Sequence, residues 1–178
     1  VFRIAIRGKG AHAAMPHNGI EPIPAACQMV QAFQTILTRN KHPLDTGVIS
    51  VTKIHAGEAV NVVPDDCVVE GTVRTFTIEV LELIERRMKT IAEATCAAFE
   101  AQCEFEFRRQ YPATVNHVAE TDFARRVLGE VVGAQNVHDF RPTMGAEDFS
   151  YFLQAIPGCY FLIGNGDGEH REGGHGLG

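Results

Sequence analysis

Along the first 112 residues of this 178-residue chain, the apolar residues switch repeatedly between the spacing of a β-strand and the spacing of an α-helix, and this alternation limits the possible folds. Four segments have strand-like sequence, with alternating or β-branched side chains: residues 1–7, 48–54, 67–76 and the stretch around Phe105 and Phe107. Apolar residues keep helical spacing in two segments between them. We predict one helix from Pro22 to about residue 39 and another from the N-cap Thr77 to about residue 100.

The predicted order is β-α-β-β-α-β, which is the ferredoxin-like arrangement of an α+β domain. Both helices then cover one face of the sheet, and the first strand lies between the third and the fourth. The apolar strand residues face the helices: Phe2, Ile4, Ile6, Val69, Val73, Phe105 and Phe107. The charged ones share the open face: Arg3, Arg7, Glu70, Arg74, Glu104 and Glu106. Opposite charges on neighbouring strands should contribute ~0.2–1 kcal/mol per pair.

The remaining residues, 113–178, have a different organisation. We predict a helix near 119–132, a second helix opened by the motif Met144–Ser150, and an apolar strand at 159–163. One strand and two helices make a poor core of their own. The sequence therefore predicts two regions, a ferredoxin-like domain at 1–112 and an incomplete part of an α/β domain at 113–178.

Composition narrows the classes of partner. The formal net charge of −6 and the lack of a basic tract argue against nucleic acid and anionic membrane as partners. No apolar run approaches the ~20 residues of a membrane span. Five cysteines without a C-x-x-C pair are typical of reduced core residues in a cytoplasmic protein. The chain starts within a strand without Met or a signal peptide and stops in a Gly-rich run, so we expect an excised segment.

Several common catalytic motifs are absent or incomplete. The run Gly8–Ala13 fits G-x-G-x-x-A, but Pro16, Asn18 and Gly19 keep the following chain in a loop, whereas dinucleotide binding needs a helix there. No H-x-D, HExxH or C-x-x-C pattern is present, so a complete metal site within the chain is not expected. No G-x-S-x-G motif provides a nucleophile.

Three polar residues stand at or near predicted strand ends. His12 follows the first strand, Asn61 lies in the loop that enters the third strand, and Arg74 lies late on the third strand. Structural roles are an equally good interpretation: a cross-strand ion pair for Arg74 and a turn for Asn61.

Four ordered motifs carry a resemblance that spans nearly the whole chain: Gly8–His17, Asn61–Asp65, Gly71–Arg74 and Met144–Phe149. Together they resemble the metal-dependent aminoacylases and carboxypeptidases, in particular the branch of hippurate hydrolases and indole-acetyl-amino-acid amidohydrolases. The resemblance implies a catalytic domain with two divalent metal ions, zinc or manganese, and an inserted ferredoxin-like lid that forms a homodimer. A water polarised by the metals and deprotonated by a Glu would attack the amide carbonyl of a small N-acyl amino acid.

The same resemblance implies roles for individual residues. His12 would reach across the dimer and stabilise the tetrahedral oxyanion. Asn61 and Arg74 would bind the substrate, and Arg74 would pair with the carboxylate of the substrate. The resemblance also implies that three further substrate-binding residues line the pocket where the lid meets the catalytic domain: Met144, Gly145 and Glu147.

The metal ligands of this family would fall before Val1 and after Gly178. We therefore expect the segment alone to be inactive. His170 and His175 stand near the expected place of the last ligand but lack its surrounding pattern, and we assign them no role. Two other interpretations remain open. One is a dimerisation or binding module without chemistry, paired through the free edge strand 48–54. The other is a related deacylase that acts on an acyl-diamino acid.

Overall fold

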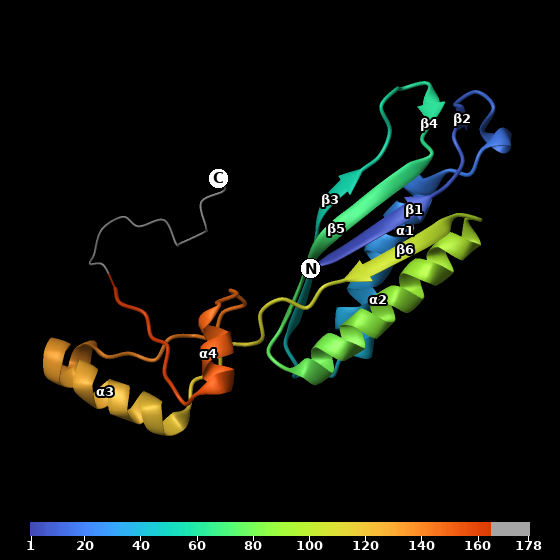
Figure 1. Cartoon of the computed structure of the whole chain (residues 1–178). Coiled ribbons are helices and arrows are strands. Elements are labelled where there is room, and N and C mark those ends of the chain that lie inside the picture. Colours follow the sequence, from blue (N-terminus) through green and yellow to red (C-terminus); the bar gives the residue numbers. More distant parts are fainter. Residues whose placement is uncertain (165–178) are drawn as a thin grey trace. The chain divides into compact units, whose positions relative to one another are not determined.

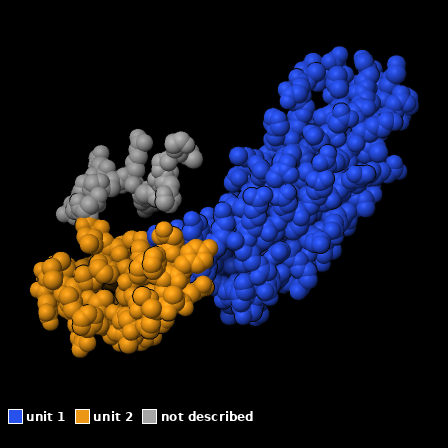
Figure 2. Space-filling model, viewed as in Figure 1, with its two compact units in different colours: residues 1–113, 141–147 blue, residues 114–140, 148–178 orange. Residues whose placement is uncertain are grey.

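The computed structural model describes residues 1–164 and divides into two compact units (Figure 2). Of the described residues, unit 1 contains 1–113 and 141–147, and unit 2 contains 114–140 and 148–164. The segment 141–147 thus belongs with the first unit, although it follows residue 112 in the chain. The domain boundaries 1–112 and 113–178 stay a prediction. His170 and His175 lie outside the described residues.

Unit 1 is built on a four-stranded antiparallel sheet with order β3-β5-β1-β6 (Figure 1). Its elements are β1 (Phe2–Arg7), α1 (Pro22–Thr35), a π-helical turn η2 (Ile36–Asn40), β3 (Gly47–His55), β5 (Asp66–Thr75), α2 (Ile78–Ala98) and β6 (Gln102–Phe107). The ferredoxin-like arrangement predicted from the sequence is confirmed, including the central place of the first strand. The predicted N-cap is confirmed too, because Thr77 Oγ1 accepts a hydrogen bond from the Val80 backbone N–H at 3.4 Å.

Both long helices cover the same face of the sheet, and the core lies between them and the sheet (Figure 1). Phe2, Ile4, Ile6, Val69 and Val73 are buried there, and Phe105 and Phe107 pack against the core from the edge strand β6. From α1 the core receives Ala25, Ala26, Met29 and Phe33, and from α2 it receives Val80, Ile84, Met88, Ala92 and Cys96. Burial of alternate strand residues fixes which face of each strand meets the helices.

One detail of the predicted core is wrong. The sequence places Cys27 among the buried cysteines, but it is exposed on α1. The buried stripe of this helix runs through Pro22, Ala25 and Met29 instead, which turns Ile23 and Cys27 toward solvent. A prediction from the larger apolar side chains therefore assigns the wrong side of the first turns of this helix to the core.

Unit 2 contains α3 (Val118–Val132), a 3-10 turn η3 (Ala134–Asn136) and α4 (Phe149–Ala155). The strand predicted at 159–163 is wrong, since the structure has no strand there. The Asn116 side chain holds the backbone of Tyr160 instead, donating to its carbonyl at 2.7 Å and accepting from its N–H at 2.8 Å. A strand needs a partner strand for its backbone groups, and the described part of unit 2 has none.

The two helices of unit 2 differ in burial, since α4 buries Ser150 and Leu153 whereas α3 buries nothing. No residue of α3 is buried, and Val118, Phe123 and Val131 are each more than 60% exposed. No helix of residues 1–164 is both long and apolar enough to cross a membrane.

Candidate functional site

His12 lies in a small antiparallel sheet beyond one end of the main sheet (Figure 1). Its strands are β2 (Ala11–His12) and β4 (Val62–Val63), with His12 opposite Val62. As expected, no long helix opens after Gly8. Between Gly8 and α1, which begins at Pro22, the chain has only the two-residue strand β2 and the three-residue 3-10 turn η1 (Pro16–Asn18). The segment therefore does not form the helix N-terminus that a dinucleotide site requires.

The His12 ring has a defined hydrogen-bonding state. Its Nδ1 accepts the backbone N–H of Ala14 at 3.1 Å. A neutral imidazole has one donor and one acceptor nitrogen, so this bond places the proton on Nε2. The side chain is exposed, and within residues 1–164 Nε2 has no hydrogen-bond partner. His12 therefore offers a directed N–H donor to a molecule outside this unit.

Asn61 stands beside His12. The backbone carbonyl oxygen of Asn61 accepts a hydrogen bond from the Ala13 backbone N–H at 2.9 Å, and this bond ties the two loops together next to the β2–β4 pair. The turn interpretation predicts that the Asn61 amide bonds its own backbone. No hydrogen bond of that side chain occurs within the described part of the chain, and the residue is exposed.

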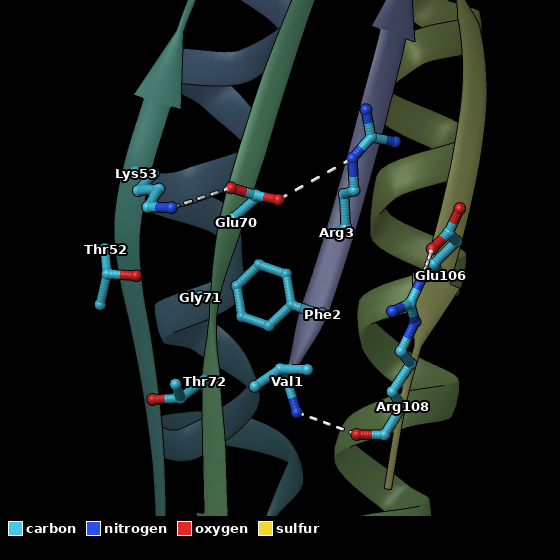
Figure 3. A pocket seen from close by; sticks show the side chains of 10 residues that line it. All are labelled: Val1, Phe2, Arg3, Thr52, Lys53, Glu70, Gly71, Thr72, Glu106 and Arg108. Atoms are coloured by element: carbon cyan, nitrogen blue, oxygen red, sulfur yellow. Dashed lines mark hydrogen bonds and ion pairs between the residues drawn. The ribbon is translucent and has the colours of Figure 1, made fainter.

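Arg74 lies on the open face of the main sheet, opposite Val48. The charge pairing predicted for this face is confirmed for other residues: Arg3 lies 3.8 Å and Lys53 3.6 Å from Glu70, and Arg7 lies 3.0 Å from Glu104 (Figure 3 shows the first two pairs). Hydrogen bonding to Glu104 raises the pKa of Arg7. Arg74 differs, since its guanidinium has no ion pair among residues 1–164. The cross-strand ion pair is therefore not its role.

The structure brings His12 and Asn61 together but not Arg74. The β2–β4 pair adjoins the Asp66 end of β5, whereas Arg74 lies eight residues further along the same strand. At about 3.3 Å per residue this is a separation of ~26 Å. One chain therefore cannot place all three side chains on one small molecule.

The other three predicted contacts lie in the segment 141–147 of unit 1. Met144 and Glu147 are half-buried, and Gly145 is exposed. A Cβ atom at Gly145 would meet only Thr143 Oγ1, at 3.6 Å. Their roles as substrate contacts stay predictions.

No group of three or more His, Cys, Asp or Glu side chains among residues 1–164 is arranged to hold a metal ion. The residues in the described part of the chain therefore do not by themselves fit a metal centre.

A further residue contacts the His12 loop, although sequence reasoning did not single it out. Asp65 accepts a hydrogen bond from the backbone N–H of Gly10. Its only signal in the sequence was its place directly after Pro64 within the Asn61 motif.

Comparison with known proteins places this geometry in a family. The family described as the peptidase dimerisation domain matches residues 1–100. N-acetyl-L-cysteine deacetylase of Bacillus subtilis is 40% identical over 169 residues, covering 95% of this chain and 40% of that protein. IAA-amino acid hydrolase ILR1-like 4 of Arabidopsis thaliana is 36% identical over 167 residues, covering 92% and 38%.

This chain is also similar to a solved structure of the same family. The YXEP protein of Bacillus subtilis, described as a dinuclear metal binding peptidase from the M20 family, superposes with a TM-score of 0.66 at 32% identity, over 88% of this chain and 38% of that one. The chain belongs to the M20 family of peptidases and amidohydrolases and carries its dimerisation domain. The family resemblance found in the sequence is confirmed. The chain spans about two fifths of the length of the curated relatives it matches.

Proposed function

We propose that this chain supplies the dimerisation lid and the substrate-contacting side chains of a longer metal-dependent amidohydrolase that cleaves small N-acyl amino acids such as hippurate. The observation that carries the proposal is a set of three accessible polar groups whose donors have no partner within residues 1–164: His12 Nε2, the Asn61 amide and the Arg74 guanidinium. Exposed polar side chains usually bond only to water, so these three are singled out by their places in the motifs Gly8–His17, Asn61–Asp65 and Gly71–Arg74. Their free donors leave them available to a ligand. The names of the deacetylase and hydrolase relatives favour an amide substrate.

Each group has a chemistry suited to part of an N-acyl amino acid. The fork of donors on Arg74 matches the substrate carboxylate through two parallel hydrogen bonds. The Nε2–H of His12 can stabilise the oxyanion that forms when water attacks the amide carbonyl. Asn61, next to His12, can hold the same end of the substrate through its amide.

The separation of ~26 Å along β5 requires two subunits if all three groups act on one substrate. His12 and Asn61 would come from one subunit, and Arg74 from its partner. This arrangement gives the proposed homodimer a catalytic reason, because each site would be incomplete in a monomer.

Mixing two inactive variants of the full-length protein tests this arrangement. We expect His12→Ala and Arg74→Ala to abolish hydrolysis separately and to restore it when their subunits exchange. Random exchange makes half of the dimers hybrid, and each hybrid has one site with both wild-type groups, so activity should return to about a quarter of wild type.

A matched control uses two variants from the same end of the lid. His12→Ala mixed with Asn61→Ala should restore nothing, because one subunit supplies both groups to a site. Size-exclusion chromatography would verify that every variant still dimerises. Hybrid dimers without activity in the first mixture would contradict the proposed sharing of residues, and full activity of the single variants would contradict the function.

The metal ions and the rest of the active site are proposed to lie in the other parts of the longer protein. Two divalent ions, zinc or manganese, would supply the activated water there. The exposed apolar residues of α3 fit this view, since an unburied Val118, Phe123 and Val131 are typical of a surface that packs against further structure. Hippurate hydrolysis by this 178-residue segment with added zinc or manganese would contradict the proposed division.

A second candidate is a dimerisation module without chemistry. The edge strand β3 favours it, because an edge presents unpaired backbone groups to a second chain. The variants above distinguish the two functions. If the lid only forms the dimer, the full-length protein should still hydrolyse its substrate when His12, Asn61 or Arg74 is replaced by Ala. A deacylase for acyl-diamino acids would respond to the same variants but prefer that substrate to hippurate. The cytoplasmic location stays a prediction.

A further inference from the structure

Asp65 holds the loop that carries His12 at two points. Its side-chain Oδ1 accepts the backbone N–H of Gly10 at 2.7 Å, and its carbonyl oxygen accepts the backbone N–H of Gly8 at 2.7 Å. Both donors belong to the segment between β1 and His12. A carboxylate acceptor forms a stronger hydrogen bond to a backbone N–H than a neutral acceptor does, so the Gly10 bond is the stronger anchor of the two.

The loop is braced on its other side as well. Lys9 and Ile20 exchange two backbone hydrogen bonds of 2.9 Å, which close the loop at its base. The approach at Gly8 admits no side chain, because a Cβ atom there would fall 2.1 Å from the Ile20 carbonyl oxygen. At Gly10 a Cβ atom would lie 3.0 Å from Asp65 Oδ1, so the side chain of Asp65 sits close against the loop backbone.

The orientation of the His12 ring depends on this bracing. The ring is held by Ala14 N–H on Nδ1, and the turn is closed by the bond from Met15 N–H to the His12 carbonyl at 2.7 Å. Beyond that turn, the β2–β4 pair contains only two residues on each side. So short a ladder cannot by itself fix a loop, and the Asp65 carboxylate supplies an anchor two residues before His12.

We propose that Asp65 is a positioning residue for His12, holding Gly10 so that the imidazole presents its Nε2–H in one direction. The inference rests on the proposed function for its effect on catalysis, but the positioning itself is a property of this chain. Asp65 does not contact substrate in this proposal and acts only through the loop.

The test compares Asp65→Ala with Asp65→Asn, which keeps an acceptor oxygen for Gly10. In the full-length protein we expect Asp65→Ala to lower kcat on hippurate on the order of a hundredfold with little change in KM, because misplacing a group that acts in the transition state costs rate rather than binding. Asp65→Asn should recover most of the loss. The matched control is Asp66→Ala, the adjacent exposed carboxylate, which has no hydrogen bond to the loop among residues 1–164 and should leave both constants near wild type.

A spectroscopic measurement on the 178-residue chain keeps the two proposals separable. Nitrogen-15 spectra of the histidine rings, assigned by comparison with His12→Gln, should show the Nε2–H form for wild type and Asp65→Asn, and a mixture of forms for Asp65→Ala. Unchanged spectra in Asp65→Ala would overturn the positioning role, and so would changed spectra with unchanged kcat when His12→Ala is inactive. If His12→Ala stays active while the spectra change as expected, the proposed function fails and the loop anchor stands.

Discussion

Gly71 of β5 lies directly against the ring of Phe2 on the neighbouring strand β1. The two residues are register partners, and a Cβ atom at Gly71 would fall 2.6 Å from Phe2 Cζ and 2.1 Å from the carbonyl oxygen of Ser50. The Phe2 ring in turn meets Phe33 of α1 edge to face, with ring centroids 6.2 Å apart. A glycine in a central strand marks such a close approach, here of β5 to the Phe2 ring on one neighbouring strand and to the backbone of β3 on the other.

Replacing this glycine should therefore destabilise the lid. We expect Gly71→Ala to lower the free energy of unfolding by ~1–3 kcal/mol, because the added methyl group forces Phe2 out of its place in the core. Urea unfolding followed by circular dichroism measures the change. Gly145→Ala is the matched control: its Cβ would meet only Thr143 Oγ1 at 3.6 Å, so stability should change by less than ~0.5 kcal/mol. Equal midpoints for the two variants would argue against the strain at Gly71.

The N-cap of α2 provides a second prediction. Thr77→Ala removes the acceptor for Val80 N–H and should cost ~0.5–2 kcal/mol of stability. Thr90 serves as the control, because its hydroxyl donates within the middle of the same helix, to the Arg86 carbonyl at 3.0 Å. Alanine is the best helix former, so Thr90→Ala should be neutral or slightly stabilising. Thermal unfolding of both variants would separate the capping effect from a general intolerance of the helix.

Much of unit 1 could be predicted from the sequence because two independent patterns agree. Alternation along β1, β5 and β6 identifies the buried face, and the charges left on the open face fit only when β1 is central. The Arg3–Glu70 and Arg7–Glu104 pairs are the direct result of that order. The buried side of α1 was predicted less well, as exposed Cys27 shows. Small residues make up part of that buried side, and they give a weaker hydrophobic pattern than large ones.

The arrangement of the candidate site could be predicted only in part. His12 and Asn61 were recognised as single residues, but their proximity depends on two-residue strands that are too short to give a periodic signal. The role of Asp65 depends on a bond from a side chain to the backbone 55 positions away, which no local pattern reveals. The distance from His12 to Arg74 likewise follows from the direction of β5 rather than from either motif.

The failed strand at 159–163 has a similar cause. A short apolar run does not distinguish a strand from an extended segment held by side chains. Here Asn116 bonds both backbone groups of Tyr160, and the Gly158 N–H donates to His117 Nδ1 at 3.2 Å. Both contacts depend on residues some forty positions earlier in the chain.

The open face of the sheet should contribute little to stability. Glu70 pairs with Arg3 and Lys53, but all three side chains are more than a third exposed, and solvent weakens such pairs. We expect Glu70→Gln to cost ~0.2–1 kcal/mol in low salt and less in high salt. The control Glu58→Gln, at a side chain that is 92% exposed, should cost less than ~0.5 kcal/mol at any salt concentration. A large loss independent of salt would indicate that Glu70 has a packing role.

The stability of the lid should also depend on alkaline pH through Cys67. Burial in the core raises the pKa of the Cys67 thiol, with smaller contributions from Cys27 and Asp66. In the unfolded chain the same thiol ionises near its ordinary value of ~8.5. Because the folded pKa is higher, the contribution of Cys67 is fully present below that value and is lost as pH rises above it. The slope cannot exceed ~1.4 kcal/mol per pH unit for one proton.

Urea unfolding between pH 7 and pH 10 under reducing conditions measures this effect. Cys67→Ala should lower stability at pH 7 but make its fall toward pH 10 smaller than in wild type, because the protein then lacks a thiol that ionises only on unfolding. Cys27→Ala is the control: that thiol is exposed and adds less to the raised pKa of Cys67 than burial does, so its removal should change the steepness of the fall much less than Cys67→Ala does. If Cys67→Ala and wild type lose stability at the same rate with pH, the alkaline loss comes from other groups, and burial of Cys67 does not control it.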